Sequence, residues 1–243
     1  MTDQNETDTP PTEAPEAPRE PERDWGWVWS NAKTILGAIA LAIVIRVVIF
    51  EAFEIDGPSM EPTLLNGDRV VVAKFPFGLF LPGTSEAVAN WGTPSVGDVV
   101  IIKSPLDDID IVKRVIGVPG DTIEMHDDAV WRNGEPIHRR VLGPCRETES
   151  SENPTDCEWV EEGVDALRWR TSHSYYSPHE DMGPMVVPPG HIFVLGDHRD
   201  RSNDSRNPRV GMIPVTRVKG RALAIYWSND EWIRWDRAFS AIH

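Results

Sequence analysis

The feature that most constrains this chain is one apolar run near its N-terminus, Thr34 to Phe50, in which Arg46 is the single charged residue. A helix rises about 1.5 Å per residue, so these 17 residues reach about 26 Å, slightly less than a hydrocarbon core of about 30 Å. Extending the helix back to Trp27 closes the gap and places tryptophans at the interface. We therefore predict a single transmembrane helix over residues 27–50.

A cleavable signal peptide is the alternative interpretation, because Ala38-Ile39-Ala40 resembles a cleavage site. The apolar run continues for ten residues beyond that site, and the segment before it is long and acidic. Neither property is typical of a signal peptide. The pattern therefore favours an anchor that stays in the protein.

The net charge of −15 is concentrated in two segments. Residues 1–24 carry eight acidic and two basic side chains, and residues 145–165 carry eight acidic side chains and one basic. The first segment is also rich in proline and lacks aromatic residues, so we expect a disordered acidic tail over residues 1–26. No basic patch of the kind that binds nucleic acid is present, so we expect no nucleic-acid partner.

The basic residues near the N-terminal end of the apolar run are Arg19 and Arg23, which precede the predicted span, and Lys33, which lies at its start. Positive residues are retained on the cytoplasmic side of a membrane. We therefore predict a single-pass protein of the cell membrane, with a cytoplasmic N-terminus and the remainder of the chain outside.

The remainder is predicted to be mostly β. Short apolar runs rich in β-branched residues indicate strands over residues 70–74, 99–103, 111–118, 191–195 and 221–227. Asn133-Gly134, between residues 130–132 and 135–137, predicts a tight hairpin. Residues 143–183 show no sustained periodicity, so we expect an irregular insertion. Together these patterns predict an antiparallel β domain with a loop-rich inserted second lobe.

Ser59 lies nine residues past the end of the apolar run. Taken alone, Gly57-Pro58-Ser59 is ordinary turn chemistry. Pro62 excludes the Ser-x-x-Lys pattern, and Glu61 excludes the Gly-x-Ser-x-Gly elbow. A catalytic Ser59 therefore needs a base from elsewhere in the chain.

Lys113 is the candidate base. It lies inside a strand-like run, and Ile111 and Val115 share its face because alternate residues of a strand do so. Burial between aliphatic side chains lowers the pKa of a lysine, and a neutral amine can take the proton of a serine hydroxyl. Arg114 points to the opposite face. The alternative is an edge-strand lysine whose stem covers apolar surface while its amine reaches water.

A charged loop over residues 196–206 follows a predicted strand and contains three Asp, three Arg and two Ser. It is either a solvated surface loop or an Asp/Arg network that places Ser202 or Ser205 against a buried amine. A Ser/His/Asp triad through His198 is disfavoured, because a lone histidine in a polar loop is usually exposed. The histidine spacings match no metal site, so we expect neither a metal nor another cofactor.

The two cysteines, Cys145 and Cys157, leave two interpretations open. In the cytosol they would be free thiols or a weak metal pair. Outside the membrane, a disulfide that closes a short loop is favoured.

Five segments follow the apolar run in order and span residues 53–227 discontinuously. They are Ile55-Asp56-Gly57-Pro58-Ser59-Met60-Glu61-Pro62-Thr63-Leu64, Gly67-Asp68-Arg69-Val70, Gly97-Asp98-Val99-Val100, Val112-Lys113-Arg114-Val115-Ile116-Gly117-Val118-Pro119-Gly120-Asp121, and the stretch from Val187-Pro188-Pro189-Gly190-His191 through Leu195-Gly196-Asp197 to Asp204-Ser205-Arg206. Taken together and in this order, they resemble the bacterial type I signal peptidase (leader peptidase) family of membrane-bound Ser/Lys-dyad serine endopeptidases.

The resemblance implies that Ser59 is the nucleophile and Lys113 the general base. Ser202 occupies the position that orients the lysine in this family. Loop-shaping positions fall on Asp197, Asp204 and Arg206. Positions that line pockets for small side chains, at the first and third residues before the cut, fall on Phe53, Ile55, Met60, Leu64, Ile101 and Val112.

Two positions depart from the family pattern. The backbone N–H of Ser59 would be one oxyanion donor, but some members supply the other from a serine where this chain has Gly57. We expect either the Gly57 N–H or a water molecule to serve there. His198 replaces an asparagine that is common in the family, and no role is assigned to it.

The resemblance implies removal of signal peptides from exported preproteins at small-x-small (Ala-x-Ala) sites, with those signal peptides and membrane lipid as partners. The implied parts are the tail (1–26), the anchor (27–50), a catalytic β domain (51–120 and 187–230), an inserted variable lobe (121–186) and a C-terminal segment (231–243). A catalytically silent, anchored extracytoplasmic binding domain is one alternative. A self-cleaving Ser/Lys repressor-type protease is another, although its DNA-binding domain is replaced here by the apolar run.

Overall fold

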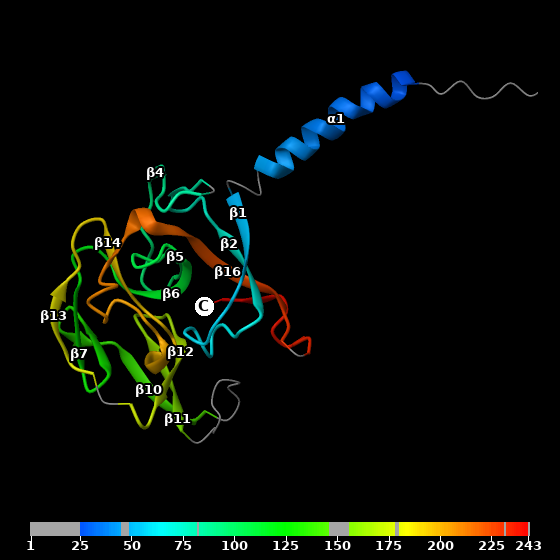
Figure 1. Cartoon of the computed structure of the whole chain (residues 1–243). Helices are drawn as coiled ribbons and strands as arrows, with labels where there is room; N and C mark the ends of the chain where they lie inside the picture. The colour runs from blue at the N-terminus through cyan, green and yellow to red at the C-terminus, as the bar shows by residue number, and fades with distance from the viewer. Residues whose placement is uncertain are drawn as a thin grey trace, which may run out of the picture. The chain divides into compact units, whose positions relative to one another are not determined.

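A computed structural model describes residues 25–44, 49–81, 83–145, 156–177, 180–230 and 232–242. These residues are mostly β, as predicted (Figure 1). The elements are α1 (Trp25–Val44), β1 (Phe50–Glu54), β2 (Asp68–Ala73), β3 (Gly78–Leu79), β4 (Ala89–Asn90), β5 (Val99–Lys103), β6 (Asp110–Gly117), β7 (Thr122–His126), β8 (Ala129–Arg132), β9 (Glu135–Pro136), β10 (His138–Pro144), β11 (Cys157–Gly163), β12 (Trp169–Ser174), β13 (Met182–Val186), β14 (His191–Leu195), η2 (Arg199–Arg201), β15 (Ile213–Pro214), η3 (Val215–Arg217), β16 (Val218–Ser228) and β17 (Ser240–Ala241).

The helix α1 has 20 residues and includes residues 27–44 of the region predicted to span the membrane. Among the described residues, no helix is both long and apolar enough to cross a bilayer. The predicted span of 27–50 includes residues 45–48, which lie outside the described residues, as does the predicted tail up to residue 24. The chain divides into a unit that ends at Leu41 and a unit that begins at Ala42.

The largest sheet lies in the second unit and is antiparallel throughout, with the order β1-β2-β16-β5-β6-β14-β15 (Figure 1). Successive residues of a strand point to opposite faces. In β5, Val100 and Ile102 therefore join one apolar cluster, while Val99 and Ile101 join another. At β5 both faces of this sheet are therefore buried, and β5 lies between β16 and β6 in the interior of the sheet.

The strands predicted from apolar runs are confirmed. Strands β5 and β14 match the predicted ranges 99–103 and 191–195, and β2, β6 and β16 overlap the other three. The predicted hairpin joins β8 to β9. Its turn residues Asn133 and Gly134 have φ of 57° and 80°, which is the left-handed geometry that a two-residue hairpin turn requires.

The irregular insertion predicted over residues 143–183 is wrong for most of the described part of that range. Strand β11 pairs with β10 and β12 in a three-stranded sheet, and β13 pairs with β7. The alternation was hidden because buried positions of β11 and β12 carry polar side chains. These are Glu162, Thr171, Ser172 and His173.

A buried ionic cluster holds this second sheet to the loop after β14. The carboxylate of Glu162 on β11 is fully buried and pairs with Arg199 of η2, and His173 Nε2 lies 3.6 Å from its other oxygen. Burial raises the pKa of Glu162, but the charge of Arg199 and the contacts of His173 outweigh burial and lower this pKa from 4.5 to about 2. The carboxylate is therefore ionised in the folded protein and compensates a buried guanidinium.

We expect Glu162→Ala to lower the free energy of unfolding by about 3–5 kcal/mol, because it leaves Arg199 buried without its counter-charge. The control is Glu161→Ala, which removes a carboxylate paired with Arg140 at the surface and should cost less than about 1 kcal/mol. The folded pKa of Glu162 lies below the unfolded value, so its contribution is present above pH 4.5 and is lost as the pH falls toward 2. Chemical denaturation of both variants at pH 7 measures the difference, and equal losses would contradict the role of Glu162.

Candidate active site

Ser59 lies in a tight connection between β1 and β2. Gly57 has φ of +98°, a backbone conformation that glycine adopts without strain. The Gly67 N–H donates to the Ile55 carbonyl at 2.9 Å, and the Glu61 N–H donates to the Pro58 carbonyl at 3.1 Å. These bonds fix the loop from within and leave Ser59 half-buried on it.

The loop after β14 holds Ser59 from the other side. The His198 N–H donates to the Ser59 carbonyl at 3.1 Å. A Cβ atom on Gly196 would lie 2.4 Å from the Ser59 carbonyl oxygen and 2.2 Å from Ser202 Oγ. Glycine at position 196 is therefore required for the close approach of the two loops.

Lys113 reaches Ser59 from the central strand β6. Its side chain is buried, with Nζ 2.9 Å from Ser59 Oγ and 2.8 Å from the Val112 carbonyl oxygen. The aliphatic side chains of Ile111 and Val115, predicted to share its face, belong to the apolar cluster that also contains Val100 and Ile102. The structure thus brings together the serine and the lysine that the sequence analysis singled out.

Burial lowers the pKa of Lys113 from 10.5 to about 8. The carboxylates of Asp204 and Asp197 act in the opposite direction, and Arg206 reinforces the lowering. A pKa near 8 means that a usable share of the lysine is neutral close to neutral pH. In that form the Ser59 hydroxyl donates to the amine lone pair, which is the arrangement that activates a serine nucleophile.

Arg114 is engaged on the opposite side of the strand. Its Nε and Nη2 donate to the two carboxylate oxygens of Asp197, each at 2.8 Å, and its Nη1 donates to the Gly97 carbonyl at 2.8 Å. The Thr63 hydroxyl donates to Asp197 at 2.5 Å, and the guanidinium carbon lies 5.1 Å from the centre of the Trp169 ring. Arg114 on β6 therefore connects the serine loop, the turn before β5 and the loop after β14.

Asp204 and Arg206 form the second charged pair. The Asp204 carboxylate accepts hydrogen bonds from Arg206 Nε at 2.8 Å and from the Gly196 N–H at 2.9 Å. Burial raises the pKa of Asp204, but Arg206 and the backbone bond prevail and hold that pKa below its ordinary value. Arg206 also donates to the Arg199 carbonyl and to Glu180, so it closes the charged loop on itself.

The two loop serines have different surroundings. Ser205 Oγ accepts a hydrogen bond from the Val194 N–H at 3.0 Å, so it braces the strand before the loop. Ser202 Oγ is buried, and the Ser202 side chain is among the contacts that lower the pKa of Asp204. The bonds of Lys113 Nζ go to Ser59 and Val112. Ser202 packs beside the Ser59 loop across Gly196 without a direct bond to the amine.

The six residues predicted to line pockets lie in one apolar cluster. Ile55, Met60, Leu64 and Ile101 are buried in it, and Phe53 and Val112 pack against it while partly exposed. Val112 and Ile101 are directly paired across β5 and β6. An apolar wall therefore adjoins Ser59 and Lys113.

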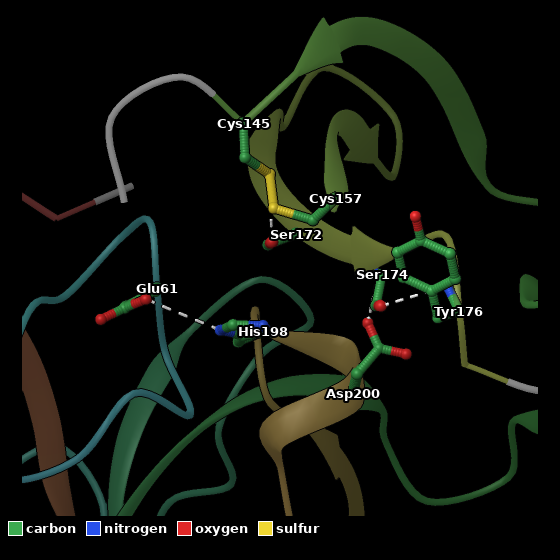
Figure 2. Close-up of a disulfide and its surroundings, with 8 residues drawn as sticks. All are labelled: Glu61, Cys145, Cys157, Ser172, Ser174, Tyr176, His198 and Asp200. Atoms are coloured by element: carbon green, nitrogen blue, oxygen red, sulfur yellow. Dashed lines mark hydrogen bonds and ion pairs between the residues drawn. A yellow bond between two sulfur atoms is a disulfide. The ribbon is translucent and has the colours of Figure 1, made fainter. Parts of the chain in front are cut away.

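Glu61 and His198 form a buried pair that the sequence analysis did not find. His198 Nδ1 lies 3.6 Å from Glu61 Oε2, and Figure 2 shows the carboxylate directed at the ring. The two residues are distant in the sequence. The expectation that a histidine in this polar loop is exposed is wrong, because His198 is buried against Glu61. The contact helps to join the serine loop to the loop that holds the Ser59 carbonyl.

Cys145 and Cys157 form a disulfide between the end of β10 and the start of β11 (Figure 2). The sulfur of Cys145 lies 3.4 Å from Ser172 Oγ, and the Ser172 N–H donates to the Asp197 carbonyl at 2.9 Å. In the described part of the chain, no group of three or more His, Cys, Asp or Glu side chains is arranged to hold a metal ion.

The Gly57 N–H, considered above as an oxyanion donor, has a partner in this structure. It donates to Asn66 Oδ1 at 3.2 Å. It would have to release Asn66 in order to reach an oxyanion.

Known proteins resemble this chain over most of its length. A family model described as "Signal peptidase, peptidase S26" matches residues 28–227. The chain is 36% identical over 199 residues to "Signal peptidase I" of Bacillus licheniformis, covering 82% of this chain and 88% of the relative. It is 35% identical over 211 residues to "Signal peptidase I" of Pseudomonas fluorescens, covering 82% and 72%. It is 34% identical over 208 residues to "Signal peptidase I T" of Bacillus subtilis (strain 168), covering 86% of each.

A buried lysine bonded to a half-buried serine defines a candidate hydrolase that needs no histidine. The chain belongs to the signal peptidase family, peptidase S26, and is a serine endopeptidase.

We expect Gly196→Ala to lower the rate of peptide-bond cleavage by about 100-fold, because the added methyl group displaces the Ser59 loop and a shift of about 1 Å in a reacting group costs that much. Gly183→Ala is the matched control, since a Cβ there would meet no atom within 4 Å. Steady-state cleavage rates, with circular dichroism to verify folding, provide the test. Wild-type activity of a folded Gly196→Ala variant would contradict the required close approach.

Proposed function

We propose that this chain is a membrane-bound serine endopeptidase that removes N-terminal signal peptides from exported preproteins, with Ser59 as nucleophile and Lys113 as general base. The observation that carries the proposal is the 2.9 Å contact between Lys113 Nζ and Ser59 Oγ, made by a lysine that is 3% exposed. Membership of the signal peptidase family supports the substrate class.

In the proposed reaction, the neutral Lys113 amine takes the Ser59 proton as Oγ attacks the scissile carbonyl. The resulting ammonium then gives that proton to the leaving amine, which departs as the N-terminus of the mature protein. Lys113 next takes a proton from water, which attacks the acyl-enzyme. The bond between Ser59 Oγ and the acyl group then breaks, the ammonium returns its proton to Ser59 Oγ, and the signal peptide leaves with a new C-terminal carboxyl group. The Val112 carbonyl, which accepts a bond from Nζ, limits rotation of the amine between these steps.

The charged loop serves the base in this proposal. Asp197 and Asp204 shape the loop through their arginine partners, and Ser202 packs beside the Ser59 loop to restrict the Lys113 amine. The Ser59 N–H is proposed as one oxyanion donor. A water molecule is proposed as the other, because the Gly57 N–H already donates to Asn66.

The apolar wall supports a preference for small side chains. Ile55, Met60 and Leu64 are buried beside Ser59, and a shallow pocket bounded by such side chains excludes large residues by overlap. We therefore propose cleavage at small-x-small (Ala-x-Ala) sites.

The membrane remains part of the proposal. We propose that residues 27–50 anchor the chain, with the acidic tail in the cytoplasm and the β domain outside. Membrane lipid would be the second partner, met by exposed aromatic side chains near the C-terminus. Trp232, Trp235 and Phe239 are 82%, 68% and 80% exposed, a property typical of interfacial aromatics. The predicted parts, 51–120 with 187–230 and the inserted 121–186, are retained as proposed divisions of the catalytic region.

The test is cleavage of a preprotein that has an Ala-x-Ala site, in detergent or lipid, by wild type, Ser59→Ala and Lys113→Met. We expect wild type to cut at that site and both variants to lose turnover by at least about 1,000-fold, because each member of a nucleophile–base pair is needed. Lys103→Met, which removes a partly exposed lysine at the end of β5, should remain active.

Equal cleavage by wild type and both site variants would show that the dyad is misassigned. No cleavage by wild type of any preprotein would favour a catalytically silent, anchored binding domain. Cleavage of the chain itself with the preprotein left intact would favour a self-cleaving protease.

A further inference from the structure

Lys219 has an unusual position in the largest sheet. Val218 pairs with Ile102 and Gly220 with Ile101, so Lys219 is an extra residue in a β-bulge between β16 and β5. A bulge redirects the side chain of its extra residue. A Cβ on the next residue, Gly220, would lie 2.5 Å from the Ala73 carbonyl oxygen, so glycine there permits the close packing of β2 against the bulge.

The redirected Lys219 side chain points at the apolar wall of the proposed site. Its Nζ lies 4.6 Å from the centre of the Phe53 ring and 5.9 Å from that of Phe80. The same amine donates to Asp110 Oδ2 at 3.0 Å and lies 3.7 Å from Glu51 Oε1. The residue is only 9% exposed, so this cation–π contact is largely removed from water and stronger than a surface one.

These contacts join two strands that are not neighbours in the sheet. Glu51 and Phe53 belong to β1, whereas Asp110 begins β6, the strand of Lys113. In the sheet order β1 and β6 are separated by three strands. Lys219 therefore fixes the Phe53 ring relative to the strand that carries the base.

The spacing along β1 relates Phe53 to one substrate residue. Phe53 and Ile55 lie two positions apart, on the same face of the extended chain and about 6.6 Å apart. An extended substrate has the same period, so its residues at −1 and −3 also point to one side. If the −1 side chain lies against Ile55 and Met60 beside Ser59, the −3 side chain lies against Phe53.

We propose that Lys219 is a specificity-determining positioning residue. By holding the Phe53 ring and linking β1 to β6, it sets the size of the pocket that receives the third residue before the cut. This inference rests on the proposed function, because it needs a substrate that is cut beside Ser59.

The carboxylates around Lys219 do not depend on it alone. Glu51 also pairs with Lys74 at 3.0 Å, and Asp110 also pairs with Lys103 at 3.2 Å. Removal of the Lys219 charge therefore leaves each carboxylate with a partner. Lys219→Met keeps the length and the apolar stem of the side chain, so the variant should fold. It removes the cation that contacts the Phe53 ring but leaves Glu51 and Asp110 each paired with another lysine.

The experiment measures kcat/KM for two preprotein series in detergent, using the full chain. One series carries Ala, Val or Leu at −3 with Ala fixed at −1, and the other carries Ala, Ser or Gly at −1 with Ala fixed at −3. For Lys219→Met, we expect the Ala-to-Leu preference at −3 to fall about threefold to tenfold, as loss of a buried cation–π contact allows. The preferences at −1 should stay within about twofold of wild type.

Two variants serve as controls. Lys219→Arg retains a cation over the Phe53 ring, so it should keep the wild-type preference for Ala over Leu at −3. Lys103 is the other cation paired with Asp110, and its amine also donates to the Asp108 carbonyl. Lys103→Met should leave the preferences at −1 and −3 unchanged.

An unchanged −3 preference in Lys219→Met, or equal losses at −1 and −3, would overturn the role of Lys219 while the proposed function stands. The same loss in Lys103→Met would overturn it too, because the effect would then come from Asp110 alone. No cleavage of any preprotein by wild type would overturn the proposed function and this inference together.

Discussion

The proposed chemistry depends on the burial of one amine, that of Lys113, which is only 3% exposed. A lysine in water is almost wholly protonated at neutral pH and cannot act as a base. Lys113 is less fully protonated because its side chain is buried, and burial lowers its pKa to about 8. Because every residue of β5 pairs with β6, including Val100 with Lys113, the position of the amine is set by a strand rather than by a loop.

Two buried carboxylates near the lysine would reverse this effect if they lacked partners. Asp197 and Asp204 both raise the pKa of Lys113. Each is bound by an arginine, Arg114 for Asp197 and Arg206 for Asp204, and the charge of Arg206 lowers the lysine pKa directly. The ion pairs let the protein use carboxylates to shape the loop without holding the base in its charged form.

Much of the fold and of the candidate site could be predicted from alternation and turn chemistry. The strands at 99–103 and 191–195 and the Asn133-Gly134 hairpin came from local pattern. Local pattern made Ser59 and Lys113 candidates only, and the family resemblance assigned their roles. Strands β11 and β12 were missed because Glu162 and its neighbours replace apolar residues at buried positions. Gly196 was missed because its need for a hydrogen side chain arises from a contact with Ser59, which is remote in sequence. Lys219 was missed because a bulge resets the alternation that would have placed it.

The pKa of Lys113, measured directly, is the most informative quantity. Lysine labelled with ¹³C at Cε, observed by NMR in the full chain in detergent and assigned by comparison with Lys113→Met, gives this pKa without any substrate. We expect a midpoint near pH 8, with cleavage activity rising through the same range as the amine loses its proton. A midpoint at or above 10.5 would contradict a neutral lysine base and would require a different base for Ser59.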